Sequence, residues 1–216
     1  MIYQAAIFDM DGTLLDSERV CLECFNEVGA RYGLADLTPV FMQIVGRSGM
    51  TEEKIITAGL EGRVPFQTFV TAWDEELQQA HSKGVPVKDG AVELLTLLQD
   101  AGLPMAVATS TRHDNARAHL EHAGLLGFFD HVVGGDQVTH RKPDPEPYLK
   151  VASLLGVDPK LSVMFEDSGP GTEAAVRAGG VVVQVPDLKA PDPDIVAFGH
   201  VIAPSLLEGA KEIGLI

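Results

Sequence analysis

The chain has 216 residues, of which 45% are hydrophobic and 22% are charged, so it can bury a substantial core and is not expected to be disordered. Its lysines and arginines number 16 against 31 aspartates and glutamates, and the resulting formal net charge of −15 disfavours binding to nucleic acid or to an anionic membrane. Because the sequence has neither a long apolar run nor a basic segment at its start, we expect a protein that enters no membrane and resides in the cytoplasm.

The first predicted strand, residues 3–8, ends in two carboxylates, Asp9 and Asp11. A buried strand that stops in an Asp-x-Asp-Gly turn places both acids at one edge of a sheet, where their like charges require a cation or a shared proton. Oxygen ligands favour a hard cation such as Mg2+. An ordinary turn is the alternative. An EF-hand loop is disfavoured because its sixth and twelfth positions would hold Leu14 and Val20.

The segment from residue 17 to residue 84 is predicted to contain helices and no strand. Its helical patterns cover residues 17–32, 38–44, 51–58 and 66–83. Because this segment directly follows the first strand and both of its connections are short, we expect an inserted cap domain that moves about a hinge. Helices that pack into a single core with the rest of the chain are the alternative.

The two cysteines of the chain, Cys21 and Cys24, lie in the first of these helices with C-x-x-C spacing. Such spacing occurs in redox motifs and in zinc sites. Since the sequence has no second pair, we interpret both as reduced helix residues.

The remainder of the chain alternates strands and helices. Further strands are predicted at residues 104–108, 131–133, 161–165, 180–185 and 201–202. Helices are predicted at residues 91–101, 113–123, 145–155 and 171–178. Most of the strands are continuous apolar runs, which is typical of parallel strands buried on both faces. The predicted fold is therefore α/β, a doubly wound, Rossmann-like parallel sheet of residues 1–16 and 85–216, with the helical cap of residues 17–84 inserted.

Polar side chains follow these strands at the points where ligands bind in open parallel sheets. Thr109 and Ser110 follow the second strand, Lys142 lies beyond the third, and Glu166 and Asp167 follow the fourth. Because the carboxyl ends of parallel strands meet at one edge of a sheet, we expect these residues to form one site with the acids of the first strand.

These four clusters resemble the four successive motifs of the haloacid dehalogenase-type phosphatases, in the same order. The resemblance is carried mainly by the phrases Phe8-Asp-Met-Asp-Gly-Thr-Leu-Leu-Asp-Ser17 and Phe165-Glu-Asp-Ser-Gly-Pro-Gly171. The long interval after the first motif resembles the branch with a helical cap, and the resemblance covers essentially the whole chain. Within this family, the β-phosphoglucomutase and sugar-phosphatase group is the most similar.

The resemblance implies that Asp9 attacks phosphorus and becomes an aspartyl phosphate. Asp11 would protonate the leaving oxygen and later deprotonate water. It further implies that Mg2+ is held by the Asp9 carboxylate, the Asp11 backbone carbonyl and Asp167, where it neutralises the transition-state charge.

For the other motif residues, the resemblance implies that Thr109 and the Ser110 amide bind phosphoryl oxygens and that Lys142 neutralises the remaining charge. Glu166 would ligate the metal, act through water or serve the structure. Taken alone, Thr109 is also a candidate helix cap and Lys142 a candidate solvated loop lysine. Arg141 stands where relatives often have Gly, so the loop before the lysine is expected to differ.

The cap is expected to carry selectivity for the substrate. Arg47 lies in the predicted loop between the second and third cap helices, where an arginine in relatives contacts a second phosphate or a sugar; a surface arginine is the alternative. Cys21 lies near the position where phosphoglucomutase relatives carry a histidine, which counts against a mutase.

We therefore predict a Mg2+-dependent phosphatase that hydrolyses a small phosphorylated metabolite, a sugar phosphate, through an aspartyl-phosphate intermediate. A phosphomutase of the β-phosphoglucomutase type is the alternative, followed by a non-catalytic binding module. A dehalogenase is disfavoured because those relatives use one Asp and no metal. We expect no nucleic-acid or membrane partner, and a monomer or weak dimer.

Overall fold

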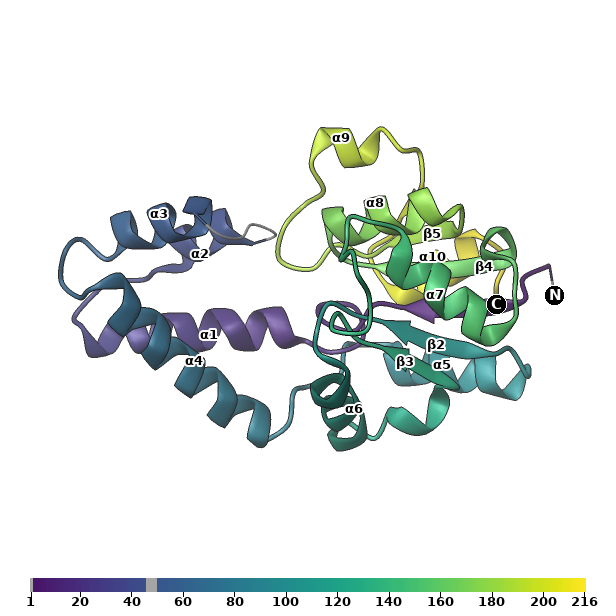
Figure 1. The fold of residues 1–216 in the computed structure, drawn as a ribbon, viewed down its shortest axis with the longest axis horizontal. Helices are drawn as coiled ribbons and strands as arrows, with labels where there is room; N and C mark the ends of the chain where they lie inside the picture. Colours follow the sequence, from purple (N-terminus) through teal and green to yellow (C-terminus); the bar gives the residue numbers. More distant parts are fainter. Residues whose placement is uncertain (1, 46–49) are drawn as a thin grey trace. The chain divides into compact units, whose positions relative to one another are not determined.

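A computed structural model describes residues 2–45 and 50–216 of the chain and shows two compact units (Figure 1). The first unit comprises Met1–Asp16 and Pro86–Ile216, and the second comprises Ser17–Val85. The second connection between the units thus falls one residue later than the sequence predicts.

The first unit is built on a six-stranded parallel sheet with the strand order β3-β2-β1-β4-β5-β6. The strands are β1 (Ala5–Phe8), β2 (Met105–Ala108), β3 (His131–Val133), β4 (Ser162–Glu166), β5 (Val181–Gln184) and β6 (Val201–Ile202). The three central strands β2, β1 and β4 are buried along their whole length, because helices cover both faces of the sheet. The predicted fold class, an α/β doubly wound sheet, is confirmed.

Among the described residues of this unit, six α-helices and two short 3-10 helices, Leu126–Phe128 and Pro159–Leu161, accompany the sheet. The α-helices are α5 (Ala91–Asp100), α6 (His113–His122), α7 (Glu146–Leu155), α8 (Gly169–Ala178), α9 (Pro193–Val196) and α10 (Leu206–Glu212). Helix α7 packs on β1, β2 and β3, and α8 packs on β4 and β5, whereas α10 packs on α5 (Figure 1). The chain runs outward from β1 to β3 and then returns through α7 to β4 on the other side of β1. The order therefore reverses between β1 and β4, and such a switch point is where doubly wound sheets bind ligands.

Two helices at the end of the chain were not predicted. Helix α9 begins at Pro193, a residue that is favoured at the first position of a helix. Helix α10 begins after Ser205, whose hydroxyl accepts a hydrogen bond from the backbone N–H of Glu208 at 3.2 Å. This Ser-x-x-Glu pattern is a capping box, so the sequence did carry a signal for α10.

The described residues of the second unit form four helices and no strand. These helices are α1 (Ser17–Arg31), α2 (Thr38–Ile44), α3 (Met50–Gly59) and α4 (Phe66–Ser82). Their core is aromatic: the ring of Phe25 makes edge contacts with Phe41, Phe69 and Trp73 at centroid distances of 5.4, 5.0 and 4.9 Å. Such contacts add to the apolar burial that holds α1, α2 and α4 together.

Across residues 2–45 and 50–216, none of the helices has the length and apolar character that spanning a membrane requires.

Candidate active site

Three strand ends of the first unit meet at the switch point. Phe8, the last residue of β1, pairs with Val107 on one side and with Phe165 on the other. The polar residues that come next along these strands are consequently neighbours at one edge of the sheet. Asp9 and Thr109 are almost completely buried.

Lys142 lies among these strand ends and is buried, with 5% of its side chain exposed. Its ammonium group donates to Asp9 Oδ1 at 2.5 Å, to Glu166 Oε1 at 2.6 Å and to the backbone carbonyl of Ala108 at 2.8 Å. These contacts use all three ammonium protons, so this residue is not a solvated loop lysine.

Charge and burial together shift the pKa values of this ion pair. Burial raises the pKa of Asp9 well above its ordinary value, and the positive charge of Lys142 opposes that shift only in part. Burial alone would lower the pKa of Lys142, but the charges of Asp9 and Glu166 outweigh it and raise that pKa. One cation thus faces two buried carboxylates, and a second cation at this edge is electrostatically favoured.

The carboxylates at this edge fit a hard divalent cation. Asp9, Glu166 and Asp167 each place one oxygen within 4.8 Å of the others. A Cβ at Gly12 would lie 2.4 Å from Asp167 Oδ2, so the absence of a side chain lets this carboxylate approach the turn after β1. The φ of Gly12 is +79°, a backbone conformation that glycine adopts readily. Thr13 Oγ1 donates to Asp167 Oδ1 at 3.4 Å. An all-oxygen donor set of this kind suits Mg2+.

Both oxygens of Glu166 already have protein donors. Oε1 accepts from Lys142 and from the hydroxyl of Tyr148 at 2.5 Å, while Oε2 accepts from the amide and hydroxyl of Ser168 at 3.4 and 3.2 Å. Gly171 leaves room for this carboxylate, because a Cβ there would lie 2.0 Å from Oε1. These contacts favour Asp9 and Asp167 over Glu166 as metal ligands and give Glu166 the task of orienting Lys142.

Asp11 is engaged by two hydroxyl groups from the end of β2. Its Oδ2 accepts from Thr111 Oγ1 at 2.7 Å and from Thr109 Oγ1 at 3.3 Å. The N-cap position of α6 belongs to Arg112, so Thr109 does not cap this helix. Ser110, the residue between the two threonines, is exposed.

The structure adds two side chains that the sequence did not single out. Tyr148 is fully buried on α7, and its pKa is raised by burial and then by the negative charge of Glu166, so its hydroxyl keeps its proton and donates. A tyrosine inside a helix lies outside the strand-end pattern and gave no signal. Thr111 belonged to the polar run after β2, but the sequence gave no reason to distinguish it from its neighbours.

The predicted selectivity residues belong to the second unit. Cys21 lies on α1, half-buried, and its carbonyl accepts a hydrogen bond from Trp73 Nε1 at 3.2 Å. Arg47 lies outside the described residues. The roles of both residues in selectivity stay predictions.

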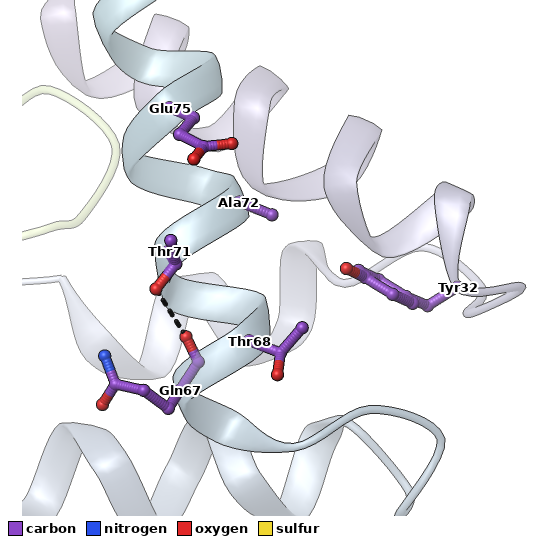
Figure 2. Close-up of a pocket in the computed structure, with 6 residues that line it drawn as sticks. All are labelled: Tyr32, Gln67, Thr68, Thr71, Ala72 and Glu75. Carbon is purple, nitrogen blue, oxygen red and sulfur yellow. Dashed lines mark hydrogen bonds between the residues drawn. The ribbon is translucent and has the colours of Figure 1, made fainter.

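A shallow pocket of about 430 Å3 lies within the second unit, between α4 and the end of α1 (Figure 2). It is lined by Tyr32, Gln67, Thr68, Thr71, Ala72 and Glu75. The Thr71 hydroxyl is turned back to the carbonyl of Gln67 at 2.8 Å. Among the predicted site residues that the structure describes, none lines this pocket, so its presence adds nothing to their assignment.

Comparison with known proteins decides the family. Residues 6–185 match the family described as haloacid dehalogenase-like hydrolase. The chain is a haloacid dehalogenase-like hydrolase. The predicted family and the prediction of a hydrolytic enzyme are thereby confirmed.

This hydrolase has similar curated relatives. It is 36% identical over 192 residues to the phosphorylated carbohydrates phosphatase of Thermotoga maritima, covering 87% of this chain and 89% of the relative. It is 34% identical over 190 residues to the fructose-1-phosphate phosphatase YqaB of Escherichia coli, covering 85% of this chain and 96% of the relative.

Solved structures of similar proteins share the fold over nearly the whole chain. A provisionally named β-phosphoglucomutase from Thermotoga maritima has a TM-score of 0.81 and 31% identity, with 99% of each chain covered. A hydrolase of the same family from Deinococcus radiodurans, solved with phosphate and sodium bound, has a TM-score of 0.78 and 29% identity, with 93% of this chain and 90% of that chain covered.

Proposed function

We propose that this hydrolase is a Mg2+-dependent phosphatase that releases phosphate from a small phosphorylated metabolite through an aspartyl-phosphate intermediate. The observation that carries the proposal is the burial of Lys142 between Asp9 and Glu166 at the switch point of the sheet. A fixed buried cation beside a carboxylate at a ligand-binding edge suits the capture of an anionic phosphoryl group.

The reaction has two halves in this proposal. In the first, an Asp9 oxygen forms a bond to phosphorus while the bond from phosphorus to the leaving oxygen breaks, and Asp11 gives its proton to that oxygen. In the second, Asp11 takes a proton from water, whose oxygen attacks phosphorus and returns Asp9 to its carboxylate form.

The phosphoryl group needs partners for its other oxygens. The Thr109 hydroxyl and the Ser110 amide supply them in this proposal, and Lys142, whose three protons are already used, neutralises the remaining negative charge. The Asp9 carboxylate, the Asp11 carbonyl and Asp167 would hold Mg2+, which neutralises negative charge on the phosphoryl group. Glu166 holds Lys142 in place through its own contact to the ammonium group.

We propose a sugar phosphate as the substrate, because two of the similar relatives are named for phosphorylated carbohydrates and fructose 1-phosphate. The net charge of −15 disfavours nucleic acid and anionic membranes as partners. We further expect the chain to act in the cytoplasm, as a monomer or weak dimer.

A phosphomutase is the second candidate, favoured by the fold similarity to the provisionally named β-phosphoglucomutase. A mutase returns the phosphoryl group to a sugar hydroxyl rather than to water. The half-exposed Cys21, near the position of the histidine in mutase relatives, supports the phosphatase instead.

A metabolite panel tests the proposal. The purified chain is incubated with Mg2+ and a set of sugar phosphates, and both free phosphate and isomerised sugar phosphate are measured. Release of phosphate that depends on Mg2+ is expected. Isomerisation without phosphate release would favour the mutase, and the lack of either product across the panel would contradict both functions.

A further inference from the structure

Thr111 has no part in the reaction proposed above, yet its hydroxyl makes the shorter of the two hydroxyl contacts to Asp11. The distance from Thr111 Oγ1 to Asp11 Oδ2 is 2.7 Å, within the range of a good hydroxyl–carboxylate hydrogen bond. The contact from Thr109 Oγ1 to the same oxygen is 3.3 Å, beyond that range. Thr111 is therefore the stronger of the two hydroxyl partners of this carboxylate.

The backbone that carries Thr111 is fixed by the loop after β3. The N–H of Gly135 donates to the Thr111 carbonyl at 2.9 Å. A Cβ at Gly134 would lie 2.8 Å from that carbonyl oxygen, and a Cβ at Gly135 would lie 2.3 Å from the carbonyl oxygen of Ser110. Both glycines thus permit a backbone approach that no other residue allows. The Thr111 hydroxyl is presented from a braced position rather than from a free loop.

Thr109 cannot serve Asp11 throughout the reaction. Its hydroxyl already accepts the N–H of Thr111 at 3.0 Å, and it has a single proton to donate. In the proposed function that proton goes to a phosphoryl oxygen once substrate is bound. Asp11 then retains one of its two hydroxyl partners, Thr111.

We propose that Thr111 is a positioning residue that holds Asp11 Oδ2 in the orientation needed for proton transfer to the leaving oxygen. A threonine hydroxyl both donates and accepts, so it can hold the carboxylate and the carboxylic acid alike. The transferred proton moves from Asp11 to the leaving oxygen as the bond to phosphorus breaks, and the Thr111 proton stays on its own oxygen. The inference rests on the proposed function.

The test is the dependence of the rate on the leaving group. For wild type and Thr111→Val, kcat/KM is measured with Mg2+ on a series from 2,4-dinitrophenyl phosphate to phenyl phosphate, since this parameter reports the steps up to the aspartyl phosphate. A phenolate with a low pKa leaves without a proton, whereas phenolate itself needs one. Thr111→Val should lose about tenfold on phenyl phosphate and little on the dinitrophenyl ester, and Thr111→Ser should restore the wild-type dependence.

Thr109→Val is the matched control. It loses the proposed contact to the phosphoryl group, together with the weaker 3.3 Å contact to Asp11 and the acceptor for the Thr111 N–H. Its kcat/KM should therefore fall for every ester, with a smaller dependence on the leaving group than in Thr111→Val. A uniform loss in Thr111→Val, or none, would overturn the role of Thr111. If circular dichroism shows that the valine variant is unfolded, Thr111→Ala and Thr111→Ser are compared by the same criterion. A wild-type protein inactive on every ester would instead count against the proposed function.

Discussion

Tyr148 and Lys142 converge on one oxygen of Glu166. The tyrosine hydroxyl lies 2.5 Å and the lysine nitrogen 2.6 Å from Oε1, and that nitrogen also lies 5.0 Å from the centre of the tyrosine ring. The tyrosine ring therefore lies beside Lys142, and the tyrosine hydroxyl binds Glu166, the ion-pair partner of that lysine. The position of the ring adds a cation–π attraction to Lys142. The buried carboxylate and cation are fixed by one aromatic side chain from α7.

Tyr148→Phe tests this arrangement. The substitution keeps the ring and removes one donor from a buried carboxylate, so we expect a loss of about 1–3 kcal/mol in the free energy of unfolding. Because Lys142 is then less firmly held, kcat should fall as well. The control is Tyr3→Phe, which removes a hydrogen bond of 2.9 Å to the carbonyl of Ile213. Denaturant unfolding and kcat are measured for both, and a fall in kcat in the control alone would contradict the assignment.

The fold was predictable because its signals are local in sequence. The continuous apolar strands predicted a parallel sheet, and the strand bounds were correct to within two residues. The acids and the lysine at the strand ends were predictable as one group because parallel strands end at a common edge, and the structure brings Asp9, Lys142 and Glu166 into contact.

Other parts of the site depend on packing that the sequence does not reveal. Tyr148 reaches Glu166 from a helix, which only the docking of α7 on the sheet decides. Thr109 and Thr111 are two hydroxyls of one polar run, and their different distances to Asp11 follow from the backbone geometry after β2. The selectivity role of Arg47 stays a prediction, since that residue lies outside the described ranges.

Asp9→Asn should abolish turnover without unfolding the protein. The amide keeps the size of the side chain but is too weak a nucleophile to form the covalent intermediate. Glu166 remains as a counterion for Lys142, so the buried cation is not left alone. Phosphate release and thermal unfolding are measured side by side. Substantial release by a folded Asp9→Asn protein would contradict the aspartyl-phosphate mechanism.

Asp167→Asn should weaken Mg2+ binding, because the proposed metal site loses a charged oxygen ligand. Two measurements check this. In activity, the Mg2+ concentration for half-maximal rate should rise. In stability, Mg2+ at 100 times its Kd should raise the wild-type free energy of unfolding by about 2.7 kcal/mol, and the variant should show a smaller gain at the same concentration. Equal stabilisation of both proteins would remove Asp167 from the metal site whatever its effect on activity.

The last prediction concerns the space around the buried Glu166. In Gly171→Ala the new Cβ would lie 2.0 Å from Oε1 and 2.1 Å from Oε2, so the carboxylate must move away from Lys142 and Ser168 or helix α8 must shift. We expect a loss of about 1–3 kcal/mol in the free energy of unfolding, as for other overpacked cores, together with a fall in kcat.

Gly127→Ala is its matched control, because a Cβ there meets none of the atoms that the structure describes within 4 Å, and it should leave both quantities near their wild-type values. Urea unfolding and kcat with Mg2+ are measured for the two variants. If Gly171→Ala unfolds like wild type but is less active, the carboxylate has moved without a loss in the free energy of unfolding. The fall in kcat then reflects the changed orientation of Lys142. If it matches wild type in both measurements, displacing the Glu166 carboxylate affects neither stability nor catalysis, which would contradict its role in orienting Lys142.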